Sequence, residues 1–428
     1  MTTTTNLIIS FIILLILIIH NIYISKKHNQ SLKLELYKKI KKIKIILYLV
    51  SIIIFIIFLI TNLLPLGTTP TNKEIITCII NALSVSLLTL PLSLETLYIT
   101  TFTNEEKYTY IKTIITNIYN KEYITKLNKA GINVILLSDE KTDLKEIKLE
   151  KITANNIEET IQIKTDNLKI LDKRINKTIT IKETKSLENS YNKISNARYK
   201  NDNYIKTLKY LLVTYTTLVL SYFFLDIMSF PITYNILLIM ILKLYTTVIS
   251  RVLYKYLPYD KELMNRTVKP NNIIMGTQEA LLTIIECFIS FFFISLPYMY
   301  VLAKGAGFLF GNTIYFVTFI LTNIFLSYYY LNDSSFLLNI IRNIKNIRFH
   351  IFTIISIIFI IFINNNNFFL TRNITLYNNI GCLIISVVCI LSLEIIKLTR
   401  FISSKGKNKN ANKNNKKSRR SKSNNSQQ

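Results

Sequence analysis

The sequence has no tryptophan, and it has only eight glycines, four cysteines and three histidines among its 428 residues. The cysteines, Cys78, Cys287, Cys382 and Cys389, all fall inside apolar runs and lack the spacing of metal ligands. We therefore expect them to be small buried hydrophobic residues. The histidines are scattered along the chain. These scarcities argue against a metal centre built from Cys and His, and we expect no metal and no cofactor.

Long apolar runs decide the class of protein. Half of the residues are hydrophobic, and runs of about 18 or more apolar residues match a hydrocarbon core about 30 Å thick. We predict an all-α polytopic membrane protein with about nine transmembrane helices and a small cytoplasmic α/β remnant. The predicted spans are Leu7–Tyr23, Ile45–Leu64, Ile75–Phe102, Leu208–Ile227, Ile232–Leu253, Leu281–Leu302, Thr313–Leu331, Ile351–Ile363 and Ile380–Leu398. The run Ile351–Ile363 is short and needs flanking residues from Arg348 to Asn364 to cross a bilayer.

Acidic residues are scarce: 25 Asp and Glu stand against 52 Lys and Arg, for a net charge of +27. Basic segments remain on the cytoplasmic side of a membrane. The basic segments therefore predict a multi-pass protein of the cytoplasmic or plasma membrane, with a cytoplasmic C-terminus and an external N-terminus. They are Lys26–Lys44, Arg251–Lys269, Arg342–Arg348 and the tail beyond Ser403.

The two ends of the chain have distinct patterns. The first run has lysines directly after it and none before it, so residues 1–30 are expected to form a membrane anchor rather than a cleaved signal peptide. The tail 403–428 is low in complexity and basic, and we expect it to be disordered. It has no aromatic residues to stack on bases, so no specific nucleic acid is predicted. Anionic lipid would attract it by about 1 kcal/mol for each basic residue near the surface. A solvated tail that fixes the topology is the simpler interpretation.

A polar cytoplasmic segment, residues 105–197, separates the third and fourth spans. The stretch Tyr123–Gly131 followed by Ile132–Leu137 predicts a helix that ends at glycine and then a buried strand, which is an α/β unit. The polar turn Ser138-Asp139-Glu140 follows that strand, at the end where α/β folds place ligands. Residues Leu144–Asn196 are too rich in lysine to bury much, and they are expected to form a small subdomain or to be partly disordered.

The order of motifs from Arg198 to Arg266 carries a family resemblance. A polar helix containing Arg198-Tyr199 leads into Tyr210-Leu211-Leu212, and the loop Pro258–Arg266 follows the next apolar run. This order resembles the fifth and sixth transmembrane helices of P-type cation-transporting ATPases. In that family a G-R-x-x-Y-x-N-I stalk precedes Y-L-L, and a P-x-D-x-x-x-M-x-R loop follows.

The resemblance extends to three regions. Residues 31–104, with Leu90-Pro91-Leu92, are similar to the family's third and fourth helices, the latter unwound at P-E-G-L. Lys129-Ala130-Gly131 resembles a strand unit of the phosphorylation domain. Residues 198–402 resemble the six-helix C-terminal transport-type domain, including Thr313–Phe316 and Leu391–Lys397.

The catalytic motifs of the family are absent from this sequence. D-K-T-G-T, whose aspartate is the phosphorylated nucleophile, does not occur, and neither do G-D-G-x-N-D or the T-G-E loop. Nothing resembles the nucleotide-binding or actuator domain, and there is no Walker motif. We therefore expect no catalytic residues, and no ATP-driven pumping by this chain alone.

The ion-binding positions of the family are also changed. The P-E-G-L glutamate aligns with Leu92, and the fifth-helix asparagine and glutamate align near Tyr215 and Leu218. Lys243 falls at or near the asparagine of the sixth helix. A hard cation usually needs two or more carboxylates, so the resemblance does not predict a bound ion.

A few ionisable residues remain at membrane depth: Glu95, Asp226, Lys243 and Glu286. Such groups are costly and usually functional. Pro91 frees backbone carbonyls one turn before Glu95, so we predict a polar site of Pro91, Glu95 and Lys243, in which the lysine ammonium replaces a cation. The alternative is that Glu95 and Asp226 lie in the headgroup zone and that Lys243 extends its ammonium toward water.

Two functions follow from these observations. The first is a catalytically inactive membrane scaffold or regulatory partner, for example of an intact cation pump. The second is a cation transporter that is passive, secondary, or the membrane half of a split P-type ATPase with a separate catalytic subunit. The lipid bilayer is the one partner that both require.

Overall fold

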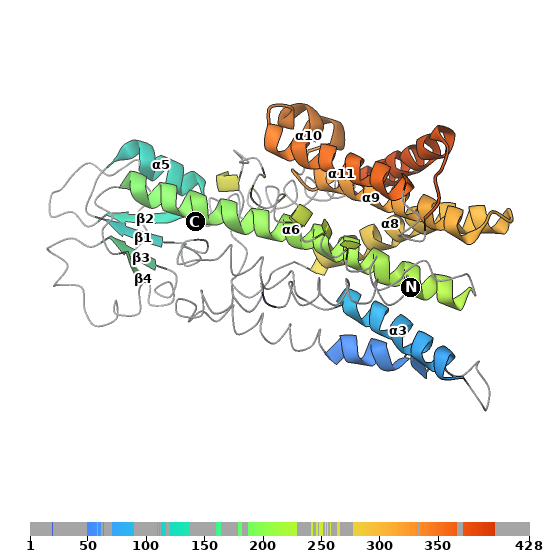
Figure 1. Cartoon of the computed structure of the whole chain (residues 1–428). Helices are drawn as coiled ribbons and strands as arrows, with labels where there is room; N and C mark the ends of the chain where they lie inside the picture. The colour runs from blue at the N-terminus through green and yellow to red at the C-terminus, as the bar shows by residue number, and fades with distance from the viewer. Residues whose placement is uncertain are drawn as a thin grey trace, which may run out of the picture.

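A long helix joins a small parallel sheet to a bundle of apolar helices (Figure 1). The elements in chain order are α3 (Asn72–Thr89), β1 (Thr113–Thr116), α5 (Lys121–Lys129), β2 (Asn133–Leu136), β3 (Thr160–Ile163), β4 (Ile179–Ile181), α6 (Leu187–Ile227), the 3₁₀ turn η6 (Leu263–Asn265), α8 (Thr277–Ala303), α9 (Phe308–Tyr329), α10 (Phe336–Asn343), α11 (Ile347–Asn365) and a C-terminal helix (Leu376–Leu398). This computed structural model describes residues 19, 49–57, 59–60, 63, 71–89, 109, 111, 113–116, 120–136, 160–163, 179–181, 187–228, 241–242, 245–246, 248–250, 253, 255, 257, 263–265, 277–332, 334–365 and 371–398.

The sheet has four parallel strands in the order β2-β1-β3-β4. Helix α5 connects β1 to β2, because parallel neighbours need a crossover. The Asn120 side chain caps α5 by accepting hydrogen bonds from the backbone N–H groups of Glu122 and Tyr123. Gly131 ends the helix with a φ of 74°, a conformation that costs a glycine little. The helix and the strand expected between Tyr123 and Leu137 are thus observed as α5 and β2.

Helix α6 takes part in two hydrophobic cores. Its first turns contribute Leu187, Ile194 and Ala197 to the core beneath α5 and the sheet. Met264 of η6 packs into the same core. Farther along, α6 packs against α3 and α8. With 41 residues, α6 spans about 60 Å at 1.5 Å per residue, long enough to extend from the membrane bundle to the sheet.

Helix α9 lies at the centre of the bundle, in contact with α8, α10 and α11. In its most apolar window 78% of the residues are buried, compared with 39% for α8 and 33% for the C-terminal helix. The outer sides of α8, α11 and the C-terminal helix expose Leu, Ile and Phe side chains. These apolar outer surfaces are what a bilayer requires, because lipid replaces water as the solvent of the bundle.

Four described helices are long and apolar enough to cross a membrane: Leu187–Leu225, Glu279–Ala303, Phe308–Tyr329 and Leu376–Leu398. They coincide with four of the predicted spans. Helix α11 runs from Ile347 to Asn365, so the short run at 351–363 is extended at both ends, as expected. Only residue 19 of the predicted run at 7–23 is described, and of the run at 232–253 only residues 241–242, 245–246, 248–250 and 253 are described. The count of about nine spans therefore stays a prediction.

The described parts of residues 144–196 belong to a small subdomain, which is one of the two alternatives expected for this segment. Strands β3 and β4 pair in parallel next to β1, and α6 already begins at Leu187. Leu187, Ser190 and Ile194 are buried. The prediction of little burial was wrong for this last part, because α6 covers α5 and buries its spaced apolar residues there.

Replacing Leu127 by Ala tests the core beneath the sheet. Leu127 is fully buried between α5 and its neighbours, and a cavity of this kind costs about 2–5 kcal/mol. The full-length protein is kept in detergent micelles and treated with trypsin at increasing urea concentrations. We expect trypsin to cleave residues 105–197 of the Leu127→Ala variant at a lower urea concentration than in the unchanged protein. Asn128→Ala is the matched control, because Asn128 is exposed on the same helix. Equal urea midpoints for the two variants would contradict this packing.

Candidate functional site

The predicted polar site of Pro91, Glu95 and Lys243 lies outside the residues whose side chains the structure describes, as does the Asp226 side chain. The pairing of Glu95 with Lys243 therefore stays a prediction. The described part of the bundle instead contains two buried polar clusters. One lies between α6 and α9, and the other surrounds Glu286.

The first cluster is centred on Asn323 in the middle of α9. Its Oδ1 accepts hydrogen bonds from the hydroxyls of Thr214 at 2.8 Å and Tyr210 at 3.3 Å, both on α6. Its Nδ2 donates to the carbonyl oxygen of Phe319 one turn earlier, at 2.8 Å. All three side chains are buried. Tyr210 and Thr214 reach the same amide because residues four apart share one face of a helix. We call Tyr210, Thr214 and Asn323 the asparagine cluster.

Further hydroxyl contacts connect the residues around 246 with α6 and with α11. Thr246 donates to the Tyr215 hydroxyl at 3.1 Å, and Tyr245 donates to Ser356 of α11 at 3.0 Å. These contacts satisfy polar groups that would be costly to leave alone in an apolar medium. They place Tyr215, which the sequence resemblance sets near a cation-binding position of the family, in a side-chain hydrogen bond.

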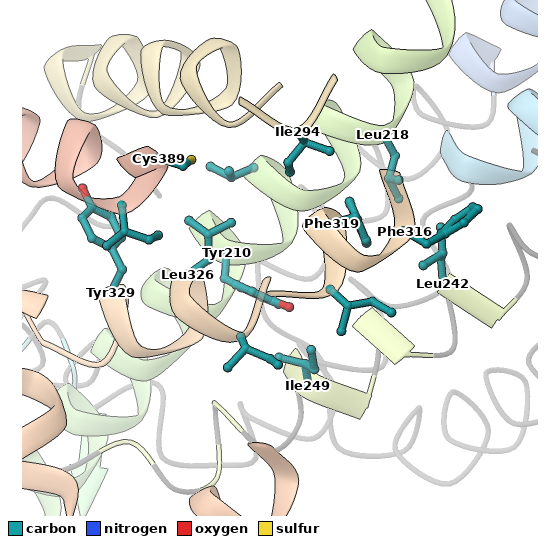
Figure 2. Packing of buried hydrophobic residues seen from close by; sticks show 14 of the residues in the cluster. Tyr210, Leu218, Leu242, Ile249, Ile294, Phe316, Phe319, Leu326, Tyr329 and Cys389 are labelled. Carbon is teal, nitrogen blue, oxygen red and sulfur yellow. The ribbon is translucent and has the colours of Figure 1, made fainter. Parts of the chain in front are cut away.

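The asparagine cluster is poorly suited to a divalent cation. The two helices that form it contain no Asp or Glu in Leu208–Leu225 and Phe308–Tyr329, and the sequences Ile232–Ser250 and Ile347–Asn365 contain none either. Leu218, which the sequence resemblance sets near the other cation-binding position, is fully buried in the hydrophobic cluster with Phe316 and Leu242 (Figure 2). Hard divalent cations need six or more oxygen ligands, with carboxylates among them. The oxygens of this cluster are neutral and already hydrogen-bonded to one another.

The second cluster surrounds Glu286, a fully buried carboxyl group in α8. Its Oε1 accepts from the Tyr329 hydroxyl at 3.1 Å, and its Oε2 accepts from the Tyr330 hydroxyl at 2.6 Å. The Tyr329 hydroxyl also lies 3.1 Å from the carbonyl oxygen of Leu393 in the C-terminal helix. We call Glu286, Tyr329 and Tyr330 the glutamate clamp, since it joins α8, the end of α9 and the C-terminal helix.

Lys397 lies next to the clamp, at the C-terminal end of α9. Its ammonium group donates to the carbonyl oxygens of Tyr329 at 2.6 Å, Asn332 at 3.2 Å and Ser334 at 3.2 Å. It also lies 3.8 Å from the centre of the Tyr329 ring and 3.6 Å from Glu394 Oε1. A cation is favourable here because helix C-terminal carbonyls carry partial negative charge. Glu394 in turn accepts from the Phe336 backbone N–H at 2.9 Å.

Lys206 reaches the same end of α9 from α6. Its ammonium group lies 3.4 Å from the Leu331 carbonyl oxygen and 3.4 Å from Asn332 Oδ1. It also forms an ion pair with Asp202 at 2.7 Å. Two lysines, each with a carboxylate one turn away, therefore meet the terminal carbonyls of α9. Their charges are balanced locally, as buried charges require.

Sequence reasoning finds one member of these clusters and misses the others. Glu286 stands out as an ionisable residue at membrane depth, but its partners do not. The available signals are weak: an asparagine inside an apolar run, and consecutive tyrosines at its end. Neither pattern states which helix supplies the partner. Within the described residues, no group of three or more His, Cys, Asp or Glu side chains could hold a metal ion.

Comparison with protein families finds a relative of part of the chain. Residues 231–399 match the family described as "Cation transporting ATPase, C-terminus". The matched range includes α8, α9, α10, α11 and the C-terminal helix, and so contains the glutamate clamp. A comparison with curated proteins finds no match.

Replacing Tyr330 by Phe tests the glutamate clamp. The variant loses the hydrogen bond to Glu286 Oε2, and we expect a loss of about 1–3 kcal/mol in the free energy of unfolding. The measurement is the fraction of monodisperse protein left after heating in detergent. Tyr377→Phe is the control, because Tyr377 is 84% exposed. In a Glu286→Gln background the same change should cost less. Strictly additive losses would contradict a direct contact.

Replacing Lys397 by Met tests the cap on α9. Methionine keeps most of the apolar stem but cannot donate to the three carbonyl groups. We expect a loss of about 1.5–3 kcal/mol, the range for hydrogen bonds from charged groups, by the same heating assay. Lys304→Met is the control, because Lys304 follows α8 at an exposed position. The cap is disproved if the two variants are equally stable.

Proposed function

Starting from the relationship of residues 231–399 to the C-terminal transmembrane domain of P-type cation-transporting ATPases, we propose that this multi-pass membrane protein is a catalytically inactive scaffold or regulatory partner. It retains the helical bundle of the transport domain and uses it for assembly rather than for ion binding. Its partner in this proposal is an intact cation pump or a separate catalytic subunit. The plasma membrane, with the C-terminus on the cytoplasmic side, is the location that the basic segments favour.

One observation carries the proposal. The apolar part of α6, Leu208–Leu225, contains no carboxylate, and neither does α9 or α11. The polar groups there are hydroxyls and an amide that satisfy one another. A pump must bind its cation strongly in one state and release it in another. Neutral oxygen groups of this kind bind a dehydrated divalent ion only weakly.

The glutamate clamp supports the same function. Glu286 is a carboxylate at membrane depth, which is usually a functional residue. Its two oxygens, however, accept hydrogen bonds from Tyr329 and Tyr330, which join α8 to α9. Each oxygen is thus already engaged by a hydroxyl group, and a cation that bound Glu286 would compete with this contact between the helices. The clamp therefore favours a structural role for this carboxylate.

The alternative is a cation transporter: passive, secondary, or the membrane half of a split ATPase. Glu286 is the observation that favours it, since the bundle retains one buried carboxyl group. A neighbouring reading frame that encodes D-K-T-G-T would favour the split enzyme. The basic tail, residues 403–428, would add attraction to anionic lipid in either case.

Ion flux separates the scaffold from the transporter. The full-length protein is reconstituted into liposomes, and uptake of radioactive calcium and rubidium is followed with and without ATP. We expect no uptake above that of protein-free liposomes, and no acid-stable label from γ-labelled ATP, because no aspartyl phosphate can form without its nucleophile.

Variants make the flux result specific. Uptake that falls in Asn323→Leu or Glu286→Gln, but not in Ser392→Ala, would establish a transporter and refute the scaffold. Ser392 is a suitable control because its hydroxyl donates to Val388 in its own helix.

A further inference from the structure

Helix α10 has its polar side facing inward and its apolar side facing outward. Asn339 and Asn343 lie one turn apart and are buried. On the opposite side Leu337 is 67% exposed, Ile341 61% and Ile344 60%. A helix on the surface of a water-soluble protein has the reverse arrangement. The environment outside α10 is therefore apolar.

The inward side of α10 supports the end of α9. Asn339 Nδ2 donates to the carbonyl oxygens of Tyr328 and Asn332, both at 3.1 Å. Asn343 Nδ2 donates to the backbone carbonyl of Asn339 at 2.8 Å. These hydrogen bonds fix the rotation of α10 about its axis, so its apolar side cannot turn inward without leaving buried polar groups unsatisfied.

The outward side is continuous with the lipid-facing side of α11. Ile347, the first residue of α11, is 70% exposed, and Ile351, Ile354 and Ile358 follow along α11 as exposed residues. Figure 1 shows α10 beside the beginning of α11. The exposed apolar side of α11 therefore extends onto α10.

Basic residues accompany this apolar side. Arg342 and Lys345 are exposed on α10 and the turn that follows it. This end of the bundle is also where Lys206 of α6 meets Leu331, close to the point at which α6 leaves the bundle toward the sheet. Amphipathic helices with Leu or Ile on one side and basic residues nearby lie in the headgroup region of a membrane.

We propose that residues 336–347 form a binding surface for anionic phospholipid, on the membrane side from which α6 extends toward the sheet. The apolar side chains of α10 insert between acyl chains. Arg342 and Lys345 contact the negatively charged headgroups. Lipid binding by α10 is independent of the scaffold role, because it depends on the surface of α10 and not on any ion or partner.

The absence of tryptophan from the chain permits a direct test. Ile341→Trp in the full-length protein introduces a single fluorophore on the outward side of α10. The protein is reconstituted into mixed phosphatidylcholine and phosphatidylglycerol nanodiscs, with one of the two lipids brominated. We expect brominated lipid to quench the fluorescence of the Ile341→Trp variant strongly and aqueous acrylamide to quench it weakly. Asn128→Trp, on the exposed side of α5, should behave in the opposite way.

The preference for anionic lipid is tested with neutral variants in the Ile341→Trp background. At equal mole fractions, brominated phosphatidylglycerol should quench the introduced fluorophore more than brominated phosphatidylcholine. Arg342→Gln and Lys345→Gln should each lower that preference by up to about fivefold, since a basic residue near a charged surface contributes about that factor. Lys304→Gln should leave the preference unchanged.

Three results would overturn the proposal in whole or in part. If acrylamide quenches the Ile341→Trp variant as strongly as the Asn128→Trp variant, α10 faces water. If neither acrylamide nor brominated lipid quenches it, a protein partner or a second copy of the chain covers α10. Equal quenching by the two brominated lipids would remove the anionic specificity.

Discussion

The carbonyl groups at the C-terminal end of α9 must be satisfied inside the bundle, and the arrangement of the other helices depends on this constraint. Helix α9 is the most buried of the apolar spans, so little water can reach its end. Lys397 of the C-terminal helix, Lys206 of α6 and Asn339 of α10 all donate to carbonyl oxygens between Tyr328 and Ser334. Three elements far apart in the sequence are thereby held at one point, and the glutamate clamp joins α8 to the same place.

This arrangement separates the bundle into two chemically different levels. The asparagine cluster, near the middle of α9, contains neutral groups that hydrogen-bond to one another. The charged groups lie at the end of α9, where lysines have both carbonyl and carboxylate partners. In the described bundle, the charged side chains of these lysines contact helix-end carbonyl groups and neighbouring carboxylates. Helix α10 lies beside the charged end of α9. Its asparagines point toward α9, and its exposed isoleucines point outward, toward lipid in our proposal.

Helix α6 gives the sheet a mechanical connection to the bundle. Its first turns belong to the core beneath α5, and its later turns carry Tyr210 and Thr214 to the asparagine cluster. One continuous helix therefore contributes side chains both to the core beneath the sheet and to the core of the bundle.

The sequence by itself determined the membrane class, the positions of the long apolar helices and the α5–β2 unit, because hydrophobic length and a glycine-terminated helix are local signals. It also identified Glu286 as unusual, since a carboxylate inside an apolar run is visible without any neighbour. Only the tertiary structure decided that Tyr329 and Tyr330 bind that carboxylate, that Lys397 caps α9, and that the apolar side of α10 faces outward. These features depend on which helix faces pack together in three dimensions, even between consecutive helices such as α8 and α9, and a run of residues does not encode that pairing locally.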